Sequence, residues 1–120
     1  MKAIVLALAM LVACSSSNRL TGLNATQAGL MGAKVAFDLY DEQHTIDIVD
    51  QAKAKGETLE QEKADRAAYK VTQQKILGSF QHAFALLSGA YQANDNISLG
   101  LLTDAVTQLR AELALIGVKL

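Results

Sequence analysis

The feature that most constrains the fold is the absence of proline anywhere in 120 residues. Proline interrupts helix interiors, whereas the alanine, leucine, glutamine and lysine that enrich this chain favour helices. Half of the residues are apolar and 19% are charged, which is typical of a globular rather than a disordered protein. The length allows one small domain. We therefore expect a single all-α domain.

Capping residues and glycines divide the chain into three predicted helices. Asn24, Thr58 and Ser98 have side chains that commonly cap a helix N-terminus, and Gln61 completes a capping box with Thr58. Glycine follows the first and the third helix, as is common at helix C-termini. The predicted boundaries are 24–55, 58 to about 91, and 98–117, with a turn at 94–96.

Each predicted helix has an apolar stripe with spacings of three and four residues, which predicts one buried face per helix. The third stripe is a heptad pattern of the coiled-coil type. The stripes comprise Leu30, Ala33, Phe37, Tyr40, His44 and Ile48; Tyr69, Ile76, Phe80, Phe84, Leu87 and Tyr91; and Leu99, Leu102, Val106, Leu109, Leu113 and Ile116. The short connection at Gly56 makes the first two helices antiparallel neighbours, with His44 facing Tyr69.

The third helix is about half as long as this hairpin and can cover only the half nearest the N-terminus. The other half is polar, because residues 41–70 hold eight acidic and five basic side chains. We expect a three-helix bundle over 23–120, from which a charged two-helix arm projects. The arm is either an ordinary solvated helix pair or a binding surface for a partner. Its candidate binding residues are Asp41, Glu42, Asp47, Asp50, Glu57, Glu60, Glu62, Asp65 and Arg66.

The N-terminus has the organisation of a targeting segment. Lys2 is followed by eleven apolar residues, 3–13, and then by Cys14, which is the only cysteine. The apolar run has the length of a signal-peptide core and is too short to span a bilayer. The tetrapeptide Leu11-Val12-Ala13-Cys14 resembles a bacterial lipobox. The alternative is an ordinary buried cysteine in an N-terminal helix.

The lipobox resemblance implies a processed, membrane-anchored lipoprotein. Residues 1–13 would be removed, and Cys14 would carry a diacylglycerol and an N-acyl group such as palmitate, with no other cofactor. Residues 14–22 would then form the lipidated N-terminus and a polar tether. Ser15 and Ser16, with no aspartate beside them, resemble the pattern that sorts lipoproteins to the outer membrane, so the periplasmic face of that membrane is the expected location.

Composition and spacing argue against several other functions. A net charge of −1 argues against a nucleic-acid partner, and one cysteine excludes an internal disulfide and a cysteine zinc site. His44 has Asp41 and Asp47 three residues away on each side, which resembles half of a carboxylate-bridged metal site. His82 supplies no second half, so we expect no metal centre and no enzyme. His44 should instead hydrogen-bond to a neighbouring carboxylate or to Tyr69.

Two further patterns concern helix contacts. Small residues recur every four positions in the first helix, which allows the third helix or a second copy to approach closely. These rows are Ala25, Gly29 and Ala33, and Ala28, Gly32 and Ala36. Leu101 and Leu115 lie off the main stripe of the third helix, on a second face, and favour self-association.

These observations predict a non-enzymatic interaction or structural module that binds a protein partner or itself. The overall plan resembles small lipoproteins of phages and prophages, and also the helical pilotin-type lipoproteins that escort envelope components. A different function is carriage of a small apolar ligand. Its cavity would be lined by Phe37, Phe80, Phe84 and Tyr91.

Overall fold

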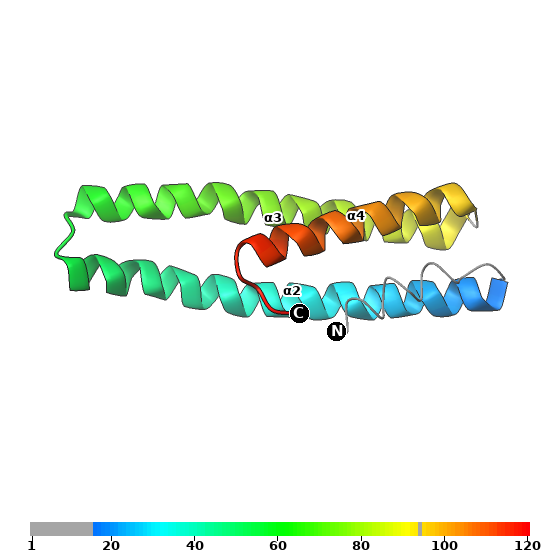
Figure 1. The fold of residues 1–120 in the computed structure, drawn as a ribbon. Helices are drawn as coiled ribbons and strands as arrows, with labels where there is room; N and C mark the ends of the chain where they lie inside the picture. The colour runs from blue at the N-terminus through cyan, green and yellow to red at the C-terminus, as the bar shows by residue number, and fades with distance from the viewer. Residues whose placement is uncertain (1–15, 94) are drawn as a thin grey trace.

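The fold is an antiparallel helical hairpin with a third helix along half of it (Figure 1). The computed structural model describes residues 16–93 and 95–120. Helix α2 spans Ser16–Lys55, α3 spans Leu59–Ala93, and α4 spans Asn96–Leu115. The molecule measures 59 × 23 × 16 Å, and the described residues contain no strand. The predicted all-α class and helical bundle are confirmed.

The predicted stripes form the core of the bundle. Phe37 of α2 and Phe80 of α3 are each 1% exposed, and their ring centroids lie 6.0 Å apart. The α4 stripe is buried along its length, with Ile116 half-buried at the end. The hairpin register is also as predicted, because the rings of His44 and Tyr69 face each other at 4.3 Å. Burial of large apolar side chains is therefore concentrated where all three helices meet.

Both predicted signals at the hairpin turn are present. The Thr58 N–H donates to Gln61 Oε1 at 2.8 Å, and the Gln61 N–H donates to Thr58 Oγ1 at 3.2 Å. Gly56 adopts a positive φ of 66°, and the Glu57 N–H donates to the Ala52 carbonyl at 2.9 Å. These bonds satisfy backbone groups at the end of α2 and the start of α3, so the sharp turn leaves few of them unpaired.

The predicted start of the first helix is wrong, because α2 begins eight residues before Asn24. The Arg19 guanidinium reaches the turn after α3 and donates to the carbonyls of Ala90 at 2.7 Å and Asp95 at 2.8 Å. Leu23 is buried in the core one turn later. Residues 16–22, which we expected in a polar tether, are therefore part of the folded helix. Asn24 lies on its surface.

The predicted cap of the third helix is also wrong. Asp95 is the N-cap of α4, and its carboxylate accepts the Ser98 N–H at 2.7 Å. This hydrogen bond holds the pKa of the Asp95 carboxyl below its ordinary value. Ser98 thus lies in the first turn of α4 instead of before it, and an aspartate three residues earlier takes the capping position. Gly117 ends the region as predicted, with a φ of 88°.

Close packing of α4 against the small-residue rows of α2 is not observed. Helix α4 packs mainly on α3. A Cβ atom added at Gly32 would meet no heavy atom within 4 Å. The third helix therefore does not approach closely at this position, where a groove lies instead, and close approach of a second copy stays a prediction.

The lipobox residues Leu11, Val12, Ala13 and Cys14 lie outside the described residues. Among the helices that are described, none combines the length and the apolar character that a membrane crossing requires.

Candidate functional site

The arm formed by residues 41–70 extends beyond the end of α4 and is the main candidate site (Figure 1). Between these positions Ala52 is the one fully buried residue. Two helices without a large apolar core have little hydrophobic stabilisation of their own. The arm therefore depends on polar contacts and on its continuity with the bundle.

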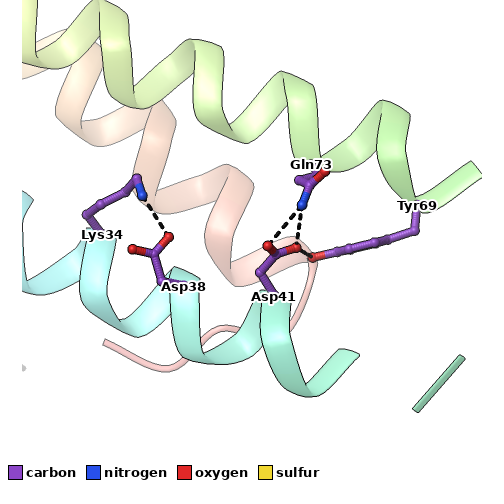
Figure 2. Close-up of polar contacts among 5 residues, drawn as sticks. All are labelled: Lys34, Asp38, Asp41, Tyr69 and Gln73. Atoms are coloured by element: carbon purple, nitrogen blue, oxygen red, sulfur yellow. Dashed lines mark hydrogen bonds and ion pairs between the residues drawn. The ribbon is translucent and has the colours of Figure 1, made fainter. Parts of the chain in front are cut away.

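A polar cluster ties the two helices together at the base of the arm (Figure 2). The Tyr69 hydroxyl donates to Asp41 Oδ1 at 2.7 Å. Gln73 Nε2 donates to both carboxylate oxygens of Asp41, at 2.8 and 2.9 Å. Burial raises the pKa of the Tyr69 phenol above its ordinary value, and the hydrogen bond to Asp41 raises it further. Asp41 is thus half-buried and hydrogen-bonded within the protein, and its role in partner binding stays a prediction.

His44 lies between two tyrosine rings beside this cluster. Its ring centroid is 5.3 Å from that of Tyr40, nearly parallel to it, and 4.3 Å from that of Tyr69. Its Nδ1 is 3.4 Å from the Tyr40 hydroxyl. The predicted hydrogen bond to a carboxylate or to Tyr69 is wrong, because the Tyr69 hydroxyl is directed at Asp41. In the parts of the chain that the structure describes, no three His, Cys, Asp or Glu side chains form a cluster suited to a metal ion.

The aromatic residues line a cleft of about 510 Å³ between the two helices of the arm. Its lining includes the aromatic side chains of Tyr40, His44 and Tyr69 and three charged side chains, those of Lys55, Glu57 and Asp65. The pKa of the Glu57 carboxyl is raised by loss of surrounding water and by the neighbouring Asp65 carboxylate. The cleft thus combines aromatic faces with two acidic side chains and one basic side chain, Lys55. Aromatic faces of this kind can contact a cationic side chain from a partner.

Most of the other predicted arm residues are on the solvent side. Those classed as exposed are Glu42, Asp50, Glu60, Asp65 and Arg66. The remaining ones are half-buried and have local partners or neighbours. Asp47 accepts from Gln43 at 2.9 Å, and Glu62 pairs with Arg66 at 3.2 Å. Such pairs within one helix contribute little to stability. They leave the acidic groups accessible at the surface.

Two buried charged residues were missed by the sequence reasoning. Glu112 of α4 is 8% exposed, and its carboxylate accepts from the Ser79 hydroxyl at 2.6 Å and from Gln108 at 3.3 Å. The sequence does contain a signal for its burial, because Glu112 comes three residues after Leu109 and directly before Leu113, both on the apolar stripe of this helix. Arg19 is equally buried. No sequence signal identified it, because its acceptors are backbone carbonyls far along the chain.

The four aromatic residues expected to line a ligand cavity pack mainly against one another and against the core. Phe37 and Phe80 pack against each other, and Phe84 lies 6.5 Å from Phe80 between ring centroids. Neither the arm cleft nor the groove between α2 and α4 is lined by these residues or by Tyr91. Phe37 and Phe80 are core residues, and Phe84 and Tyr91 are half-buried against the core.

Comparison of the chain with protein-family models, with curated proteins and with solved structures finds no match.

Proposed function

We propose that this protein is a small bacterial envelope lipoprotein, anchored through Cys14 and acting as a non-enzymatic interaction module. The N-terminal residues support the anchor, because an apolar run of signal-peptide length ends at the sole cysteine. Two or more acyl chains on Cys14 would give stable membrane attachment. The expected location is the periplasmic face of the outer membrane.

The observation that carries the interaction role is the arm. It projects past α4, has almost no apolar core, and exposes Glu42, Asp50 and Glu60. A helix pair of this kind gains stability from a partner that covers it. The acidic surface and the tyrosine-lined cleft favour a protein partner with basic side chains, since charge complementarity promotes association and orients it.

The anchor is tested by the intact mass of the protein purified from membranes, beside that of a Cys14→Ala variant. We expect the mass of a chain cleaved before Cys14 plus acyl groups, and we expect the variant to lose both these groups and membrane association. An unmodified chain in the membrane fraction, or an acylated variant, would contradict the anchor.

The arm is tested by photo-crosslinking in cells that express the full chain, with the photoreactive residue placed at position 46, which is exposed. The variant Glu42→Lys/Asp50→Lys/Glu60→Lys reverses three exposed charges and should abolish a specific crosslink to an envelope protein. Asp104→Lys reverses an exposed charge on α4 and should preserve it. Equal crosslinking in both variants would refute the role of the arm surface.

A further inference from the structure

A second hollow lies on the other part of the molecule, between α2 and α4. It has a volume of about 370 Å³, within the range of small-molecule sites. One wall consists of small residues of α2, including Gly29, Gly32 and Ala33, and the other consists of Val106 and Leu113 of α4. Helix α4 packs mainly on α3, and a Cβ atom added at Gly32 of α2 would meet no heavy atom within 4 Å, so this part of α2 is left uncovered.

The groove combines an apolar lining with positive charge. Arg110 of α4 and Lys119 of the C-terminal segment are its two charged lining residues, and no acidic side chain lines it. Within the part of the chain that the structure describes, neither cation takes part in an ion pair. Leu120 of the C-terminal segment also lines the groove. An apolar channel with two unpaired cations is complementary to a molecule with an alkyl chain and an anionic head.

We propose that this groove binds a free long-chain carboxylate. The alkyl chain lies along the small residues of α2, and the carboxylate is held by Arg110 and Lys119. Burial of the chain supplies most of the affinity, because each methylene removed from water contributes favourably. The charges select a carboxylate over a neutral alcohol of the same length. This site is separate from the arm, so the failure of either proposal leaves the other standing.

Gly32 offers a position at which to test this binding site. It lines the groove, and a Cβ atom there would meet no heavy atom within 4 Å, so the side chain of Gly32→Leu starts from open space beside the groove. Leucine also favours a helix interior over glycine, so the variant should fold at least as well. Gly78→Leu is the matched control, because Gly78 is a helical glycine of α3 with equally open space and does not line the groove.

The purified full chain is irradiated with a diazirine-bearing hexadecanoate, and the adducts are mapped by peptide mass spectrometry. We expect adducts within 28–36 and 106–113, a loss of about tenfold or more in Gly32→Leu, and no change in Gly78→Leu. Unlabelled carboxylates should compete about fourfold better for each added methylene. Hexadecanol should compete less well than hexadecanoate, and Arg110→Gln/Lys119→Gln should remove this difference whereas Lys53→Gln keeps it.

Three results would overturn the proposal. The first is adduct formation that is scattered, or that is equal in Gly32→Leu and Gly78→Leu. The second is a change from dimer to monomer in Gly32→Leu, which would make the groove an interface between copies. The third is labelling that appears only in Cys14→Ala, which would mean that the chain's own acyl groups fill the groove.

Discussion

Arg19 should contribute as much to stability as a large core residue. Its guanidinium is buried and donates two charge-assisted hydrogen bonds, to Ala90 and Asp95, that join the first turns of α2 to the turn between α3 and α4. Hydrogen bonds to charged groups contribute about 1.5–3 kcal/mol each, part of which is offset by desolvation of the cation. We expect Arg19→Ala to lower the free energy of unfolding by about 2–4 kcal/mol, and the melting temperature by roughly 10–25 °C.

Urea denaturation followed by circular dichroism measures this loss. Arg19→Lys should retain only part of the stability, because an ammonium group lacks the planar fork with which the guanidinium reaches both carbonyls. Arg66→Ala is the matched control and should cost at most about 0.5 kcal/mol, because Arg66 forms only an exposed pair with Glu62. If Arg19→Ala were as mild as Arg66→Ala, the first turns of α2 would not be part of the cooperative fold, and our reasoning would be refuted.

Three other outcomes are expected. Phe37→Ala should cost about 3–5 kcal/mol in urea denaturation because Phe37 is 1% exposed, and Met31→Ala, at an exposed site, should stay within about 0.5 kcal/mol. Thr58→Ala should cost about 1 kcal/mol by the same assay through loss of the capping box, and an unchanged midpoint would contradict that role. Folding raises the pKa of the Tyr69 phenol above 10.0. The contribution of Tyr69 to the free energy of unfolding should therefore be complete below about pH 10 and decline as the pH rises further. Tyr69→Phe should lose less stability than the parent protein between about pH 8 and pH 11, and an equal loss would refute this assignment.

The fold was largely predictable because its determinants are local and periodic. The stripes containing Phe37, Phe80 and Leu109 identify their buried faces from spacing alone, and the capping box at Thr58 identifies a helix start. The errors occurred where a distant contact decides the outcome. Helix α2 extends past the good cap at Asn24, because Arg19 finds acceptors more than 70 residues along the chain.

The candidate site was less predictable, because the sequence reveals charge without revealing what each charge contacts. Asp41 was assigned to the surface with the other acidic residues, but the hairpin register places Tyr69 and Gln73 within hydrogen-bond distance of it. The groove between α2 and α4 was missed for a related reason. Small residues such as Gly32 indicate only that another helix could approach α2 closely. Whether α4 does so depends on its packing against α3, which keeps it away from Gly32.

The contacts of Asp41 with Tyr69 and Gln73 also mark a boundary in cooperativity. On one side of them three helices share a core, and on the other the two helices share little beyond buried Ala52 and the contact between the rings of His44 and Tyr69. Amide hydrogens near Gly56 should therefore exchange through local opening of the hairpin end, at a lower free energy than amides near Phe80, which require global unfolding. A partner that binds the closed arm would slow amide exchange mainly near Gly56. Hydrogen-exchange mass spectrometry would then locate binding as a change in the gradient of protection along α2 and α3.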